Sequence, residues 1–265
     1  MKFLMCAPYF FGVNYVINPW MKGQEGKVNP KIAMDQWIDL RRQIAHLGEI
    51  VLVQPRVGMP DMCFTANAGF VLNKLAILSN FRHKERKGEE TFFEEWFRNN
   101  NYYALKCPSD FIFEGAGDAL NDPGRDCVWI GSGFRSNFNS TLVASIINRR
   151  IFKLRLADPR FYHLDTCFCP LDHKYIMYYP GAFEEKSLEI IRSHVPTEYR
   201  IEVSEEDALN FACNAVEIYD HIIMNDASWD LQRRLRGVGF EPIITPLAEF
   251  MKAGGAAKCL TLRLD

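Results

Sequence analysis

The sequence predicts an α/β fold made of five repeated units, each with a pair of short strands and a helix. Four segments share one form, a small or polar residue followed by an apolar strand, a turn and a second apolar strand; they cover residues 67–78, 118–130, 165–178 and 213–224. Their first residues recur about every 46–51 positions, the spacing of a repeated supersecondary unit. Five such units can close radially, which removes edge strands, or lie in an open α/β sheet; the pattern leaves both open.

The fifth unit joins the two ends of the chain. Residues 259–262 have the form of an opening strand, and residues 3–6 can complete it. If the units are radial, their first residues meet near the axis and form one site from distant segments. These residues are Asn67, Asp118, Asp165, Cys213 and Cys259.

Helical patterns separate the strand pairs. Asn29-Pro30 combines an N-cap residue with a first-turn proline, and it opens a helix that runs through Trp37 to Gly48. Further helices are predicted where apolar residues recur near i, i+3 and i+4, at residues 89–97, 140–147, 184–193 and 229–235.

Composition and charge favour one globular domain, residues 1–265. The chain is 48% hydrophobic and 24% charged, and no Pro/Gly/Ser linker divides it. A net charge of −2 gives no basic footprint for nucleic acid. The short apolar run 3–6 before Pro8 predicts a strand rather than a signal peptide, and no run approaches the ~20 residues of a membrane helix. We therefore expect a cytoplasmic location without membrane or nucleic-acid partners, and a homo-oligomer is compatible with the sequence.

The eight cysteines lie mostly in apolar, strand-like stretches. A chain of this length needs no covalent cross-links, so reduced thiols are expected, with disulfides as the less favoured alternative.

Cys259 is the candidate nucleophile. It follows Gly254-Gly255-Ala256-Ala257-Lys258, and a glycine-rich loop allows a close approach to a ligand and leaves a thiol unobstructed. Lys258 or a charged substrate can lower the pKa of the thiol. By itself, the pattern favours the plainer interpretation, a small apolar residue that opens a strand.

His163 and Asp165 lie two residues apart, so in an extended segment they share one face. That pairing suits a general acid/base beside a charge-binding carboxylate, or a histidine bound structurally to its neighbour. A zinc site of His163, Cys167, Cys169 and His173 is a weaker alternative, because no C-x-x-C knuckle is present.

Glu114 lies between an apolar run and the turn Gly115-Ala116-Gly117, where it can orient an imidazole. This turn is neither a Walker loop nor a dinucleotide fingerprint. Arg82 and Arg135 each follow a second strand, and their equivalent positions suggest two guanidinium groups at one rim that bind a carboxylate. Taken alone, each arginine fits a solvated surface side chain.

Four motifs together resemble the guanidino-group-modifying enzymes, the superfamily of arginine deiminase, dimethylarginine dimethylaminohydrolase and the amidinotransferases. They are Pro60-Asp61-x-x-Phe64, Phe113-Glu114-Gly115-x-Gly117-Asp118, His163-Leu164-Asp165-Thr166 and Gly254-Gly255-x-x-x-Cys259-x-Thr261. They follow the family's order across nearly the whole chain. The resemblance implies the fold of that superfamily, a five-bladed, pseudo-symmetric α/β propeller (pentein), with no metal and no cofactor.

The resemblance also implies roles for residues. Cys259 is similar to the family's nucleophile, His163 to its general acid/base, and Glu114 to the acid beside it. Asp165 is similar to the guanidinium-binding carboxylate. The full substrate-binding set expected here is Asn18, Asp61, Phe64, Asn67, Arg82, Asp118, Arg135, Asp165 and Ala253.

One departure indicates the reaction. Deiminases carry Phe-x-Arg-Asp where this chain has Phe64-Thr65-Ala66-Asn67. This segment, together with residues 15–20, resembles the catalytic domain of the arginine dihydrolases. That domain is better known as part of two-domain proteins. We expect that domain to stand alone here. An amide offers a neutral ureido group both a donor and an acceptor, so Asn67, with Asn18, is expected to hold it for a second attack by Cys259.

The expected reaction is therefore two thiol additions that convert arginine to ornithine, ammonia and carbon dioxide without releasing citrulline. The alternatives are arginine deiminase, dimethylarginine dimethylaminohydrolase and, remotely, a non-catalytic ribosome-associated pentein, which is expected to lack the catalytic residues retained here. Residues 14–27, rich in Gly and aromatic residues, are the candidate lid, with an ordinary connecting loop as the alternative.

Overall fold

The computed structural model describes residues 1–137 and 148–265, which form a mixed α/β structure with five three-stranded sheets. Four sheets follow in chain order: β3 Gly69–Leu72, β4 Leu75–Leu78 and β5 Tyr103–Leu105; β6 Ala119–Asp122, β7 Cys127–Ser132 and β8 Arg150–Arg155; β9 Phe168–Pro170, β10 Ile176–Tyr178 and β11 Arg200–Glu202; β12 Val216–Ile218, β13 His221–Met224 and β14 Glu241–Ile244. The fifth joins β15 Leu262–Arg263, β1 Lys2–Cys6 and β2 Glu49–Val53.

All five sheets share one pairing pattern. The middle strand is antiparallel to the first strand and parallel to the third. A parallel neighbour requires a crossover connection, and helices provide it in four units: α1 Pro30–Leu47, α2 Lys84–Lys87 with α3 Glu89–Asn99, α5 Glu185–His194, and α7 Trp229–Gly237. The short helices α6 Glu205–Leu209 and α8 Ala248–Met251 precede β12 and β15. The predicted repeat of strand pair and helix is confirmed in four units, and all five sheets have a third strand; the helix predicted for the second unit, 140–147, lies outside the described residues.

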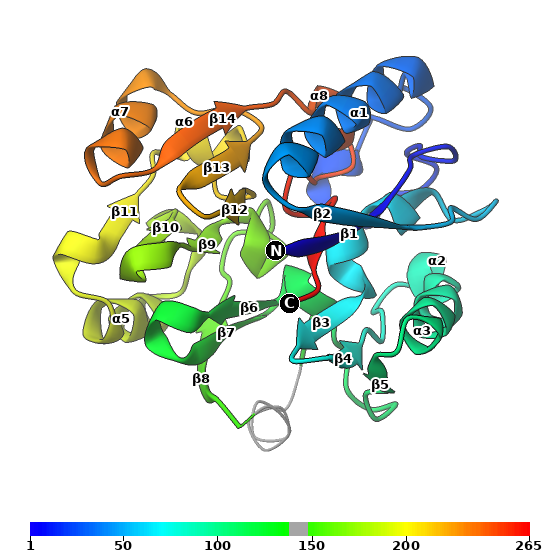
Figure 1. Ribbon diagram of the computed structural model, residues 1–265, viewed down its shortest axis with the longest axis horizontal. Coiled ribbons are helices and arrows are strands. Elements are labelled where there is room, and N and C mark those ends of the chain that lie inside the picture. Colours follow the sequence, from blue (N-terminus) through cyan, green and yellow to red (C-terminus); the bar gives the residue numbers. More distant parts are fainter. Residues whose placement is uncertain (138–147) are drawn as a thin grey trace.

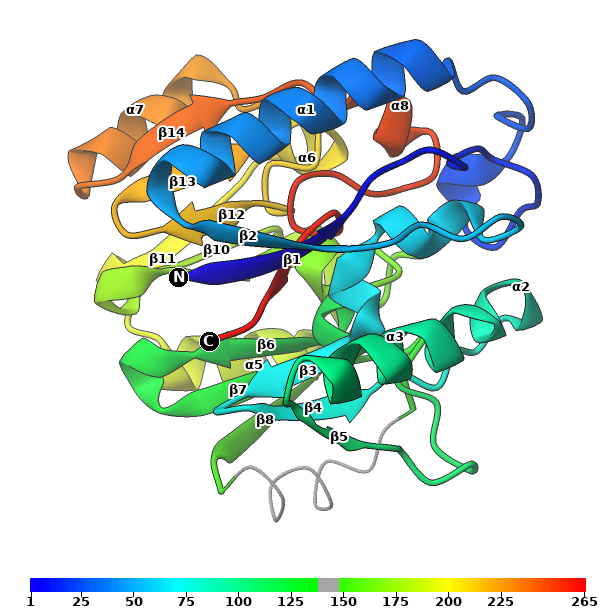
Figure 2. The same cartoon turned by 45° about the vertical axis from the view of Figure 1, so that its right-hand side comes forward.

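The two ends of the chain complete one sheet, as predicted. Phe3 pairs with Arg263 and Leu4 with Leu262. The five sheets lie around the middle of the molecule, where both termini are found (Figure 1). A view turned by 45° shows α1 and α3 on the outer side of the sheets whose strands they connect (Figure 2). The alternative of one open sheet is wrong, because the sheets are separate.

Helix α1 shows how local sequence sets an element. Asn29 Oδ1 accepts hydrogen bonds from the backbone N–H groups of Lys31 and Ile32, Pro30 occupies the first turn, and Gly48 caps the C-terminus. Such an N-cap contributes about 1 kcal/mol. The helix buries one stripe at helical spacing, Ala33, Trp37, Leu40 and Ile44.

The predicted strand starts need correction by about two or three residues. Residues 67–68, 165–167, 213–215 and 259–261 are turns rather than strand, so His163 and Asp165 do not share a strand face. Thr166 explains one case, because its Oγ1 donates to His163 O at 2.6 Å and closes a 3₁₀ turn. The predicted helices 89–97, 184–193 and 229–235 are confirmed within two residues, whereas 140–147 lies outside the described residues.

The described part of the chain contains no helix that is both long and apolar enough to span a membrane. All eight cysteines have free thiols.

Candidate active site

Five turns, one before each sheet, form a closed ring of hydrogen bonds. The turns contain Asn67, Asp118, Asp165, Asn214 and Cys259. The bonds run from Asn67 Nδ2 to Glu114 O (2.9 Å), Leu164 N to Asp118 Oδ1 (3.0 Å), Asn214 Nδ2 to Asp165 O (3.0 Å), Cys259 N to Asn214 Oδ1 (3.2 Å) and Ala66 N to Cys259 O (3.1 Å). The expected convergence of the unit starts is confirmed, with Asn214 rather than Cys213 as the contact of the fourth unit.

Cys259 is 3% exposed and lies between two polar side chains. Asn214 Nδ2 donates to Cys259 Sγ at 3.1 Å, and Sγ lies 3.5 Å from Asp165 Oδ2. Burial and the Asp165 carboxylate raise the pKa of Cys259 well above its usual value, while the N–H groups of Asn214 and Ala256 lower it. The thiol is therefore protonated in this state, and the adjacent Lys258 does not offset these effects.

His163 is held by an acid that also pairs with an arginine. His163 Nε2 and Glu114 Oε2 are 2.7 Å apart, and Arg135 Nη1 donates to the same oxygen at 2.8 Å. Burial raises the pKa of Glu114, but Arg135 and His163 outweigh it, so this pKa lies well below the usual value. Glu114 is thus an ionised carboxylate that fixes the imidazole. The alternative of His163 bonded to Asp165 is wrong.

Three buried polar atoms of predicted site residues have no partner in residues 1–137 and 148–265: Asp61 Oδ1, His163 Nδ1 and Asp165 Oδ1. Burial raises the pKa of Asp165 to about 6, although His163 and Lys258 lower it. Burial also raises the pKa of Asp61, against the effect of Arg86. Unpaired buried carboxylate oxygens are costly, and a bound cation with several N–H groups satisfies them.

Asn67 is fixed at both ends of its amide. Its Oδ1 accepts from Arg86 Nη1 at 2.8 Å and its Nδ2 donates to Glu114 O. Arg86 forms a buried ion pair with Glu89 at 2.8 Å. One N–H and one lone pair of Asn67 remain for a ligand.

The loop before Cys259 is packed by aromatic and amide side chains. A Cβ on Gly255 would lie 2.7 Å from the Phe64 ring, and Gly254, at φ +82°, lies against Asn18 and Trp20. Asn18 Nδ2 donates to Ala253 O at 3.0 Å. The glycines therefore permit close contact with Phe64 and Asn18.

The candidate lid is bonded to three other segments of the chain. Tyr15 donates to Asp61 Oδ2 at 2.8 Å, Trp20 Nε1 to Arg160 O at 2.7 Å, and Ile17 O accepts from Arg135 Nη2 at 2.9 Å. Residues 15–20 of the candidate lid are thus tied to Asp61, Arg135 and Arg160.

Two of the predicted substrate-binding residues, Arg135 and Asp118, are bonded to other residues of the protein. Arg135 is buried and its guanidinium is bound to Glu114 and Ile17, whereas Arg82 is exposed and donates Nε to Arg135 O at 3.2 Å. They are neighbours, but only Arg82 lies at a rim. Both Asp118 oxygens have partners, Ser136 Oγ at 2.6 Å and Leu164 N at 3.0 Å, so Asp118 supports the turns.

The residues of the less favoured zinc alternative do not form a cluster. Among the described residues, no three His, Cys, Asp or Glu side chains are placed to hold a metal ion. Cys167 Sγ instead donates to Leu164 O.

Comparison with known proteins gives a family. The family profile described as N,N dimethylarginine dimethylhydrolase, eukaryotic, matches residues 11–264. The chain belongs to this family. The resemblance to the guanidino-modifying enzymes is thereby confirmed.

Relatives of the family include two kinds of enzyme. The chain is 51% identical to the bifunctional arginine dihydrolase/ornithine cyclodeaminase of Nostoc sp., over 99% of this chain and 38% of that protein. It is 36% identical to the N(G),N(G)-dimethylarginine dimethylaminohydrolase of Mycobacterium tuberculosis, over 99% of this chain and 85% of that protein. The chain therefore spans about two fifths of the length of the bifunctional relative.

A solved structure covers the same region. The N-terminal domain of a cyanobacterial arginine dihydrolase, bound to its substrate, is 50% identical with a TM-score of 0.98, over 99% of this chain and 97% of that chain.

Sequence reasoning missed Asn214, Arg86 and Tyr15. Each contacts a predicted site residue that lies 19 to 46 positions away in the sequence. The contacts are Asn214 to Cys259, Arg86 to Asn67 and Tyr15 to Asp61. One signal was available for Asn214, because it lies directly after the predicted start Cys213 of a unit.

Proposed function

We propose that this chain is an arginine dihydrolase that converts L-arginine to L-ornithine, ammonia and carbon dioxide without releasing citrulline. One observation carries the proposal: Cys259 lies against Asp165, whose second oxygen is buried and has no partner among the described residues, as a guanidinium requires. The 51% identity to the bifunctional relative supports the same reaction.

The first half-reaction begins when the guanidinium binds Asp165 and Asp61. Its charge lowers the pKa of Cys259, because an opposite charge favours the thiolate. The thiolate attacks the guanidino carbon, and His163 donates a proton to the departing nitrogen, which leaves as ammonia. Water, deprotonated by His163, then hydrolyses the amidino-thioether and leaves a bound ureido group.

The second half-reaction uses the same residues on a neutral group. Asn67 offers its free N–H and lone pair to the ureido group. Cys259 attacks the ureido carbon, His163 protonates the ornithine nitrogen as it leaves, and water releases carbamate, which decomposes to ammonia and carbon dioxide. Arginine and two waters thus give ornithine, two ammonia and carbon dioxide.

The roles of the remaining residues follow from their places. Glu114 orients His163, and Arg135 keeps Glu114 ionised. Phe64 packs along the substrate, Arg82 binds its carboxylate, and Asn18 with Ala253 O fixes the loop beside Cys259. Asp118 holds the His163 turn. Residues 14–27 form a lid that excludes water and must open for exchange, since Cys259 is buried.

The domain organisation, the propeller architecture, the location and the oligomeric state are also proposals. The ring of turns and the common pairing pattern support one domain, residues 1–265, with five propeller blades. A cytoplasmic location and a homo-oligomer stay predictions.

Product analysis tests the function. Purified protein is incubated with arginine, and ornithine, citrulline and ammonia are quantified; two ammonia per ornithine with little citrulline is expected, and Cys259→Ser is the inactive control. If citrulline forms in molar equivalence to the arginine consumed and no ornithine appears, the protein is a deiminase and the dihydrolase proposal is wrong. The second candidate is dimethylarginine hydrolysis, which the family profile and the M. tuberculosis relative favour. Faster turnover of dimethylarginine than of arginine would establish that activity.

A further inference from the structure

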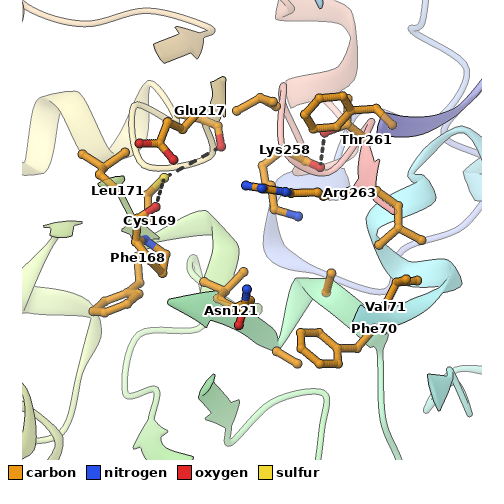
Figure 3. A pocket seen from close by; sticks show the side chains of 18 of the residues that line it. Phe70, Val71, Asn121, Phe168, Cys169, Leu171, Glu217, Lys258, Thr261 and Arg263 are labelled. Carbon is orange, nitrogen blue, oxygen red and sulfur yellow. Dashed lines mark hydrogen bonds between the residues drawn. The ribbon is translucent and has the colours of Figure 1, made fainter. Parts of the chain in front are cut away.

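A separate cavity of about 110 Å³ lies beside the chain ends (Figure 3). It is lined by residues of β6, β9, β12 and β15, and by Lys258. None of the candidate active-site residues lines it. Its apolar wall includes Phe70, Val71 and Leu171, and its polar groups include Glu217, Lys258 and Arg263.

Two cations face the interior of this cavity. The nitrogens of Lys258 and Arg263 point toward its middle in Figure 3. Lys258 Nζ has no hydrogen-bond or ion-pair partner in the described part of the chain. Toward the described residues, Arg263 donates only its Nε, to Asp265 Oδ1 at 3.1 Å. Burial lowers the pKa of Lys258, against the effect of the Asp165 carboxylate, so an anion beside its ammonium relieves the cost of burying the charge.

The two acids of the lining do not fill that role. Asp265 is shared between Arg263 and the N-terminal amine, which lies 3.5 Å from its Oδ2. Burial raises the pKa of Glu217 to about 7, so below that pH its protonated carboxyl can donate to an anion. The cavity is smaller than the engineered cavity of about 150 Å³ that holds benzene, which limits the ligand to a few heavy atoms.

We propose that this cavity binds a small planar oxyanion, bicarbonate or a short carboxylate such as formate, between Lys258 and Arg263. We expect the site to influence the nucleophile, because Lys258 directly precedes Cys259, and Asp165 and Cys259 both interact electrostatically with its ammonium. The groups that face Cys259 are Asp165, Asn214 and Tyr162. A bound anion neutralises Lys258 and makes the thiol harder to deprotonate. The proposal holds for any guanidino substrate.

Thermal unfolding of the full chain tests binding. Sodium formate, sodium bicarbonate and sodium chloride are compared at equal ionic strength. The oxyanions are expected to raise Tm with concentration, since a ligand of the native state stabilises it, and chloride is not. A response to bicarbonate alone identifies hydrated carbon dioxide as the ligand; a response to both identifies a general carboxylate site.

Two substitutions test whether the anion binds between Lys258 and Arg263. Lys258→Met and Arg263→Gln are each expected to abolish the rise in Tm, and Arg263→Gln, on a partly exposed side chain, keeps the test valid if the first variant does not fold. Arg236→Gln, which removes an exposed guanidinium paired with Glu241, is the matched control and should respond like the parent. Formate binding should weaken as pH rises through about 7, where Glu217 ionises. If chloride raises Tm as well, or if formate still raises Tm in both variants, the proposed site is wrong.

Alkylation tests the coupling without using turnover. The rate of iodoacetamide modification at Cys259 is followed by peptide mass at fixed pH. Saturating formate is expected to slow it about tenfold, equivalent to about one pKa unit, and Lys258→Met is expected to be equally slow and insensitive to formate. An unchanged rate at saturation overturns the coupling, and slowing that persists in Arg263→Gln places the anion elsewhere.

Discussion

Asn214→Asp is the substitution that most directly tests the proposed activation of Cys259 as the nucleophile. The side chains have nearly the same shape, and Asp keeps the oxygen that accepts from the backbone N–H groups of Ala256 and Cys259. It removes the two N–H bonds that Asn214 gives to Asp165 O and to Cys259 Sγ. The loop is therefore retained while the only side-chain amide donor that the described residues place at the thiol is lost.

The magnitude follows from the 3.1 Å contact. A hydrogen bond to a charged group contributes about 1.5–3 kcal/mol, and one pKa unit corresponds to about 1.4 kcal/mol. Loss of the donor should raise the pKa of Cys259 by about one to two units, beyond the rise caused by burial and Asp165. At neutral pH this lowers the thiolate fraction, and with it kcat/KM, by about 10- to 100-fold.

The assay is the pH profile of kcat/KM together with the alkylation rate of Cys259. Asn225→Asp is a matched control, because Asn225 Nδ2 also donates to a carbonyl and a sulfur, Asn210 O and Met251 Sδ, and its Oδ1 accepts from Leu247 N. Both variants should lower Tm, but only Asn214→Asp should move the ascending limb to higher pH. Profiles that coincide for the two variants refute the reasoning.

Three further predictions follow from the site. Asn67→Asp removes the donor to Glu114 O and should make citrulline accumulate, measured as the citrulline-to-ornithine ratio; an unchanged ratio contradicts the role of the amide. Asp165→Asn should abolish activity yet stabilise the substrate-free fold at neutral pH. Because the pKa of Asp165 is raised to about 6, its contribution to stability is present below the ordinary value of 3.8 and is lost as pH rises through about 6; the difference is worth at most about 3 kcal/mol in denaturant unfolding. A less stable variant contradicts this sign. Trp20→Ala removes the bond to Arg160 O and should raise KM more than it lowers kcat, whereas an unchanged KM argues against a lid.

The sequence predicts most elements because their signals are local. Asn29, Pro30 and Gly48 set the ends of α1 through contacts within four residues. The site is predicted less completely, since its geometry depends on residues far apart in sequence. Arg135 was expected at a rim, but the buried charge of Glu114, 21 positions away, holds it inside. The turns were not predicted because strand-like residues such as Phe168 follow them directly, and side-chain bonds such as that from Thr166 to His163 O separate turn from strand.

In the proposed reaction, the charge of the ligand distinguishes the two half-reactions. Burial and carboxylates raise the pKa of Cys259, Asp165 and Asp61, and a guanidinium cation opposes all three effects. The ureido group is neutral, so the second thiol addition proceeds without that help and must depend on Asn214 and Asn67. The second addition should therefore lose rate sooner than the first as pH falls, because the thiolate is scarcer without a bound cation. Products measured across the acidic limb should show a rising share of citrulline at lower pH. A share that stays constant would mean that substrate charge does not set the thiolate population.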